Sequence, residues 1–148
     1  MSDAIWVEVR IVTIVLDASV ALKLVSREPG TDQAQALVLT EERIAPDWLL
    51  AEVASGLANK VRYEGVAQGR ANAALAAVPR FIDRLFPTQP LLQDSMNLAV
   101  QLEHALYDCL YLVLALAEGG RVVTADRGFF ISASRGGFTE KVELLTWT

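Results

Sequence analysis

Two short apolar runs, each closed by an aspartate, constrain the fold of this chain more than any other feature. Residues 11–16 (IVTIVL) are followed by Asp17, and residues 121–125 (RVVTA) are followed by Asp126. Runs of this length that are rich in β-branched residues are typical of strands buried on both faces of a parallel sheet. In open α/β sheets, ligands bind in the crevice beyond the carboxyl ends of the strands. We therefore expect both aspartates to lie at the edge of the sheet where a binding site forms.

The segments around these strands carry the signals of further helices and strands. Ser19 and Thr31 stand where helix N-caps are favoured. Pro46 suits the first turn of a helix, and Gly119 follows a helical run as a stop signal. Strands that alternate with helices predict an α/β fold, a three-layer α/β/α domain around a central, mostly parallel sheet. Further strands are expected at residues 43–45 and 142–147, and helices at residues 19–25, 32–42, 46–64, 70–85, from 95 to a break at 104–105, and 107–118.

The length of the chain fits one domain, which we expect to cover residues 1–148. Hydrophobic residues make up 53% of it and the mean hydropathy is +0.33, yet no apolar run approaches the roughly 18 residues that a membrane-spanning helix needs. Residues 1–10 lack the basic start of a secretory signal, and the single cysteine, Cys109, forms no internal disulfide. These features predict a cytoplasmic, core-rich domain with no membrane partner.

Four carboxylates stand out because their neighbours in the sequence are apolar. Asp17 is the only charged residue in residues 11–22, Glu52 in residues 48–59, and Asp108 in residues 105–117. A lone carboxylate in a core segment costs several kcal/mol unless something neutralises it. Together with Asp126, these side chains predict a site where carboxylates converge on a shared cation. All-oxygen ligation suits Mg²⁺ or Mn²⁺, whereas zinc prefers cysteine and histidine, and one metal or two would both fit.

The net charge of −5 is unusual for a protein that binds nucleic acid, because phosphate contacts need lysine and arginine. Basic residues are nevertheless concentrated between residues 60 and 84. This concentration fits an ordinary solvated helical face and a surface for RNA or a partner equally well. Its members are Lys60, Arg62, Arg70, Arg80 and Arg84.

Three segments, in this order and spacing, resemble the VapC-like toxin branch of the PIN-domain family. They read IVLDASVALKL, PDWLLAEVASGLANKV and YDCLYLVLALAEGGRVVTADRGF, and the similarity extends over about residues 11–147. The resemblance implies a Mg²⁺-dependent endoribonuclease that cuts structured RNA at exposed single-stranded sites, as the toxin of a type II toxin–antitoxin module. It also implies a cognate antitoxin protein that covers the active site, and a homodimer.

The resemblance also assigns residues. Ser19 and Thr124 match hydroxyl positions beside the first and last acids. Residues 1–10 extend ahead of the usual start of such domains, either as an added edge strand or as the product of an upstream start codon. The family's metal-binding acidic quartet corresponds to Asp17, Glu52, Asp108 and Asp126.

Other side chains near the acids have structural interpretations. His104 is the only histidine, and we expect it to bond to the backbone of its loop rather than to act as a general base. Tyr107 and Tyr111 lie one helical turn apart, which favours packing over base stacking. Arg127 fits a phosphate contact and a surface salt bridge equally well. Core or dimer-interface positions are expected for Trp6, Trp48 and Trp147.

Three other kinds of function compete with the nuclease. A catalytically silent PIN-like module that binds RNA or protein would be favoured by a missing acid, and none of the four is missing. A haloacid-dehalogenase-type phosphatase needs a second aspartate two residues after Asp17, where this chain has Ser19. A phosphorylated receiver domain needs an acidic pair near the first strand and a strand-end lysine, which the sequence lacks. The nuclease is therefore the preferred hypothesis.

Overall fold

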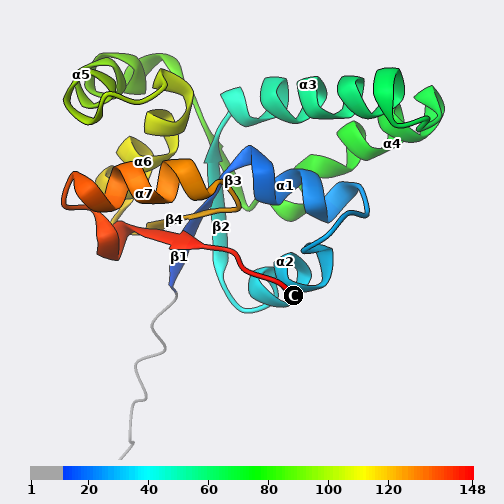
Figure 1. Cartoon of the computed structure of the whole chain (residues 1–148), viewed down its shortest axis with the longest axis horizontal. Coiled ribbons are helices and arrows are strands. Elements are labelled where there is room, and N and C mark those ends of the chain that lie inside the picture. Colours follow the sequence, from blue (N-terminus) through cyan, green and yellow to red (C-terminus); the bar gives the residue numbers. More distant parts are fainter. Residues whose placement is uncertain (1–11) are drawn as a thin grey trace, which may run out of the picture.

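The computed structural model describes residues 12–148, so the extension of residues 1–10 and Trp6 lie outside the described residues. Within this range five parallel strands form one sheet in the order β3-β2-β1-β4-β5 (Figure 1). This confirms the predicted α/β fold. The strands are β1 (Thr13–Leu16), β2 (Glu42–Pro46), β3 (Arg84–Phe86), β4 (Arg121–Thr124) and β5 (Val142–Leu144).

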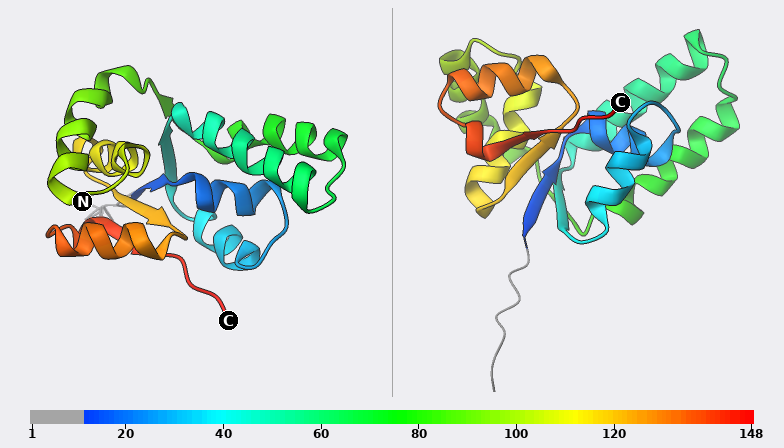
Figure 2. Two further views of the ribbon diagram at one scale, coloured as in Figure 1. Left: turned by 45° about the horizontal axis from the view of Figure 1, so that its top comes forward. Right: turned by 60° about the horizontal axis from the view of Figure 1, so that its bottom comes forward.

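Helices cover both faces of the sheet, which confirms the three-layer arrangement. Helix α6 packs against β1, β2 and β4, and α7 packs against β4 and β5 (Figure 2). The helices α1, α3 and α4 pack against one another beside the sheet. Three short 3-10 helices link some of the elements, η1 (Val78–Phe81), η2 (Gln89–Leu91) and η3 (Thr139–Lys141). The α-helices are α1 (Ala18–Val25), α2 (Thr31–Val38), α3 (Trp48–Tyr63), α4 (Gln68–Ala77), α5 (Leu92–Leu102), α6 (Leu106–Glu118) and α7 (Arg127–Arg135).

The two central strands are buried as their apolar sequences predict. Ile14, Val15 and Leu16 of β1 are fully buried, and so are the two valines of β4. Leu16 pairs with Val123, so both strands end at the same level of the sheet. This register brings the residues that follow the two strands to one place.

Three predicted helix starts are wrong in detail. Asp17 caps α1 and its side chain accepts a hydrogen bond from the backbone N–H of Ser19, which therefore lies inside the helix. Gly30, in the left-handed conformation at φ 94°, precedes α2, and Thr31 is the first residue of that helix. Pro46 ends β2, and α3 starts only after Asp47. In each case the chain enters the helix one or two residues away from the expected cap.

One strand and one helix were not predicted from the sequence. Residues 70–85 were expected to be helical, with Pro79 as a kink or boundary; the chain does turn at Pro79 in η1, but it then forms β3, a short strand that pairs with β2 alone among the described strands. Helix α7 was not expected at all. Its signals are the cap Asp126, which accepts from the N–H of Phe129, and two buried residues four positions apart, Phe129 and Ala133.

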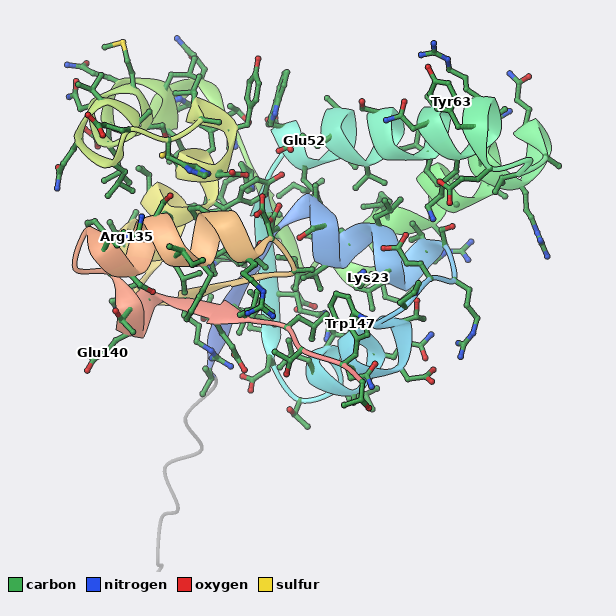
Figure 3. All side chains as sticks on the ribbon, viewed as in Figure 1. Lys23, Glu52, Tyr63, Arg135, Glu140 and Trp147 are labelled. Carbon is green, nitrogen blue, oxygen red and sulfur yellow. The ribbon has the colours of Figure 1, made fainter. Side chains whose placement is uncertain are left out.

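A buried ion cluster joins the end of α1 to the end of α3. Lys23 Nζ lies 2.9 Å from Glu28 Oε1, and Lys60 Nζ lies 2.7 Å from Glu28 Oε2. The side chains of these three residues are 8%, 9% and 17% exposed in the order Lys23, Lys60, Glu28. The Lys23 ammonium also lies 4.4 Å from the centroid of the Trp147 ring (Figure 3). Lys60 is therefore neutralised inside the protein, and Trp147 covers this cluster rather than entering the core.

Within residues 12–148, no single helix is long and apolar enough to span a membrane. Gln89–Leu102 and Leu106–Glu118 have the required length and composition only as a pair, and the pair is bent by 115°.

Candidate active site

The ends of β1 and β4 bring Asp17 and Asp126 to the same edge of the sheet. The backbone N–H of Asp17 donates to the carbonyl of Val123 at 3.1 Å, which ties the end of β1 to β4. Asp17 and Asp126 each cap the helix that follows them, α1 and α7. Asp17 is 4% exposed, whereas Asp126 lies on the surface. One acid is therefore at the floor of the site and the other at its rim.

Two hydroxyls hold the Asp17 carboxylate in position. Thr124 Oγ1 donates to Asp17 Oδ2 at 2.5 Å and accepts from the N–H of Asp126 at 3.0 Å. Ser19 Oγ donates to the same carboxylate oxygen at 3.1 Å and accepts from the N–H of Ala125 at 2.9 Å. Each hydroxyl thus links Asp17 to the chain that leads into α7.

Glu52 lies in the second turn of α3 and faces α6. Its Oε1 accepts a hydrogen bond of 2.6 Å from the hydroxyl of Tyr111, which is fully buried. Burial raises the pKa of Tyr111, and the negative charges of Asp17 and Glu52 raise it further, so this hydroxyl stays protonated and can only donate to a carboxylate. Tyr111 packs in the core as expected, but its hydroxyl also fixes the direction of Glu52.

Asp108 lies in the first turn of α6, as the sequence analysis predicted, after α5 ends at Leu102. Its Oδ2 lies 2.6 Å from Nε2 of His104. The expectation that His104 bonds to the backbone is therefore wrong, because the side chain of His104 reaches forward four residues to the acid. In this position it orients Asp108.

Burial and mutual repulsion raise the pKa values of three of the four carboxyls. Burial raises the pKa of Asp17 to about 7, and Asp108 and Glu52 add to this rise while hydrogen bonds from two hydroxyls oppose it. Burial raises the pKa of Glu52, with a further contribution from Asp108. Burial also raises the pKa of Asp108, with a smaller contribution from Asp126. Asp17, Glu52 and Asp108 are therefore each close enough to another acid for repulsion to disfavour their charge.

Lysine and arginine are absent from this group of acids. Within residues 12–148, Asp17, Glu52 and Asp126 form no ion pair, and the only ionisable base that contacts Asp108 is His104. The acids that do pair with lysine or arginine lie elsewhere, namely Glu28, Asp32, Glu42, Asp83, Glu118 and Glu143. Among the described residues, no lysine or arginine therefore neutralises the charge of these acids.

The carboxylates are near one another but do not form a closed set of ligands. In the part of the chain that the structure describes, no three acidic, histidine or cysteine side chains are close enough together to hold a metal ion. Each carboxylate instead bonds to its own donor: Thr124, Tyr111, His104 and the N–H of Phe129. The donor chemistry fits a hard divalent cation, since the candidate ligands are all carboxylate oxygens and, within the described residues, none pairs with a lysine or arginine. Holding such an ion would require these carboxylates to come closer to one another.

A model of the PIN domain matches residues 14–133, a range that includes all four acids. This chain belongs to the PIN-domain family. Ribonuclease VapC1 from two strains of Mycobacterium tuberculosis is 37% identical to this PIN domain over 84 residues, which are 55% of this chain and 61% of the relative. The match thus spans about three fifths of the length of these curated relatives. The crystal structure of PAE2754 from Pyrobaculum aerophilum is similar to this PIN domain with a TM-score of 0.70, covers 90% of both chains and is 21% identical, which establishes likeness of fold.

Proposed function

We propose that this PIN domain is a metal-dependent endoribonuclease that acts as the toxin of a toxin–antitoxin pair. The observation that supports this most is the group of four carboxylates beyond the ends of β1 and β4, none of which pairs with a lysine or arginine within residues 12–148. Six other acids of the described residues do form such pairs. The similarity to relatives named Ribonuclease VapC1 supports the same reaction class.

The residues that would hold the metal are Asp17, Glu52, Asp108 and Asp126. Mg²⁺ or Mn²⁺ suits these oxygen ligands. The chemistry that a divalent cation supplies in such a site is activation of a water for attack and stabilisation of charge on the phosphate. Neutralising the repulsion among these acids would itself favour binding of the ion, because burial and neighbouring acids raise the pKa of Asp17 to about 7 in the metal-free protein.

The remaining polar residues of the site act by positioning. Ser19 and Thr124 hold Asp17 at the end of β1. Tyr111 directs Glu52, and His104 directs Asp108. Donors of this kind, which bond to the ligands of a metal, commonly set ligand orientation and affinity. We assign His104 this role rather than that of a general base.

The proposed substrate, partner protein and assembly follow from the proposal that this domain is a ribonuclease toxin. The substrate is an RNA, cut at phosphodiester bonds in exposed single-stranded segments. A cognate antitoxin protein would cover the carboxylate site, the domain would act as a homodimer, and the setting would be the cytoplasm.

The test is cleavage of a mixed RNA pool by the purified protein with Mg²⁺, with Mn²⁺ and with EDTA. We expect cleavage only with a divalent metal, and its loss in Asp17→Asn and in Asp108→Asn. Asp32→Asn is the matched control, because Asp32 is an exposed acid paired with Arg27. Cleavage at the wild-type level by both site variants would contradict the assignment. RNA binding without any cleavage by the wild type would favour the silent binding module.

A further inference from the structure

Two aromatic rings stack between the helices that carry Glu52 and Asp108. Trp48 and Tyr107 have ring centroids 5.0 Å apart and planes inclined by 15°. Trp48 is the first residue of α3, four positions before Glu52, so the two side chains project from the same face of that helix. Tyr107 directly precedes Asp108 in the first turn of α6. The pair therefore bridges the two helices that carry Glu52 and Asp108.

This stack has surface left for another ring. Tyr107 is 49% exposed although Trp48 covers part of its ring, and Trp48 itself is half-buried. Tyr107 thus packs on Trp48 but stays half-exposed, in contrast to Tyr111, which is fully buried. An exposed aromatic ring beside a site for phosphodiester chemistry has the shape and polarity to stack on a nucleobase.

The rings stand on backbone that is already fixed. The N–H of Trp48 donates to Thr88 Oγ1 at 2.9 Å, and that hydroxyl donates to Asp47 Oδ1 at 2.6 Å. Below Tyr107, residues Cys109–Ala115 of α6 are buried in the core. A rigid platform binds a base with little loss of conformational entropy.

The charge of the domain makes a neutral contact of this kind useful for binding RNA. Of the five basic residues between residues 60 and 84, Lys60 is buried against Glu28, and Arg84 pairs with Glu42. The net charge of −5 leaves little electrostatic attraction for phosphates. Stacking supplies affinity for single strands without phosphate contacts, because every base has an aromatic face.

We propose that Trp48 and Tyr107 form a platform on which one base of a single-stranded RNA stacks next to the scissile phosphate. This inference rests on the proposed ribonuclease function. It makes Trp48 and Tyr107 positioning residues for substrate, and it predicts that the protein prefers unpaired RNA because a base inside a duplex is already stacked.

The binding test uses a fluorescently labelled single-stranded oligoribonucleotide in EDTA, with affinity measured by anisotropy. We expect Tyr107→Ala to weaken binding by about 5- to 100-fold, the range that stacking of one base supplies. Tyr107→Leu, which keeps apolar volume for packing against Trp48, should weaken it as well, whereas Tyr107→Phe should stay within about twofold of the wild type. Tyr63→Ala is the matched control, because Tyr63 is 70% exposed at the opposite end of α3 from Glu52 (Figure 3).

An oligonucleotide with one abasic position separates stacking from general loss of affinity. The experiment uses a series of oligonucleotides that each have the abasic position at a different place along the strand. One of these oligonucleotides should bind the wild type more weakly than the intact strand does. The same oligonucleotide should show no additional loss of affinity for Tyr107→Leu. Equal affinity of Tyr107→Leu and the wild type for the intact oligonucleotide would refute the proposed platform. The proposal would also be refuted if the losses of binding free energy from the abasic position and from Tyr107→Leu were fully additive at every position.

Kinetic measurements distinguish failure of the ribonuclease proposal from failure of the stacking platform. With Mg²⁺, Tyr107→Leu should raise KM while kcat stays near that of the wild type, since stacking of a flanking base acts on binding. A wild type that binds the oligonucleotide through Tyr107 but never cuts it would refute the ribonuclease and leave the platform standing. Cleavage with an unchanged KM in Tyr107→Leu would refute the platform alone.

Discussion

Replacing Glu28 by glutamine should lower the unfolding free energy of this protein more than neutralising an exposed carboxylate does. Glu28 is the only carboxylate that contacts Lys23 and Lys60 within the described residues, and both lysines are less than one tenth exposed. Glutamine keeps the shape but leaves two buried ammonium groups without a counter-ion. Removing one partner of a buried pair costs about 3–5 kcal/mol. For a domain of this size we therefore expect the melting temperature to fall by roughly 6–20 °C.

The assay is thermal and urea unfolding followed by circular dichroism, with Asp32→Asn as the control. Asp32 pairs with Arg27 on the same side of the domain, but the two side chains are 69% and 73% exposed. Such a pair contributes at most about 1 kcal/mol. Unfolding free energies of Glu28→Gln and Asp32→Asn that agree within error would refute the reasoning.

The cluster of Glu28, Lys23 and Lys60 should also make the unfolding free energy fall as the medium is acidified. Burial alone would raise the pKa of Glu28, but hydrogen bonds and charge from Lys60 and Lys23 outweigh it and hold the pKa below its ordinary value of 4.5. The stability that Glu28 contributes is therefore fully present above that value and is lost as the pH falls through the lower pKa of the folded protein. The difference in unfolding free energy between the wild type and Glu28→Gln should shrink as the medium is acidified below about pH 4.

Three further predictions concern the site and the end of the chain. In EDTA, the wild type should lose stability as the pH rises from about 4 to about 7, because folded Asp17 keeps its proton up to about 7 whereas an ordinary aspartate loses it near 3.8. Asp17→Asn should lack this loss and be as stable as the wild type or more so at pH 8; a pH series of thermal melts decides, and a destabilised variant at pH 8 would contradict it. Thr124→Val should lower the unfolding free energy by about 1–3 kcal/mol, because the buried Asp17 carboxylate loses its shortest hydrogen bond, and urea titration that finds no change would count against this role. Gly30→Ala should lower the unfolding free energy measured by urea titration more than Gly65→Ala does. Both glycines have positive φ, but only at Gly30 would a Cβ lie close to the Trp147 ring, at 2.8 Å. Equal losses of unfolding free energy would mean that this contact does not affect stability.

The parts of the fold that the sequence predicted are those with a local signal. The β-branched run before Asp17 and the apolar run before Asp126 identify the central strands directly. Strand β3 has three residues and is formed by its pairing with β2, so no periodicity within the chain could reveal it. Helix α7 had a local signal in its Asp126 cap and the spacing of its buried residues, which the sequence analysis overlooked.

Of the hydrogen bonds to the acids, only those between residues close in the sequence could be predicted. The bond between Tyr111 and Glu52 joins residues 59 positions apart, and the bond between Thr124 and Asp17 joins residues 107 apart. Such contacts depend on packing between distant elements, so the residues alone do not specify them. His104 and Asp108 are four positions apart, a spacing at which side chains across a helix start can meet, and this contact was accessible to sequence reasoning.

The pairing of β1 with β4 also fixes when the carboxylate site comes into being during synthesis. Asp17 leaves the ribosome early, but its backbone N–H bonds to Val123 and its carboxylate bonds to Thr124. A nascent chain that ends before β4 has neither contact, and pairing of segments so far apart in sequence is late in folding. Prematurely terminated products therefore carry no assembled carboxylate site, and only a nearly finished polypeptide can form it.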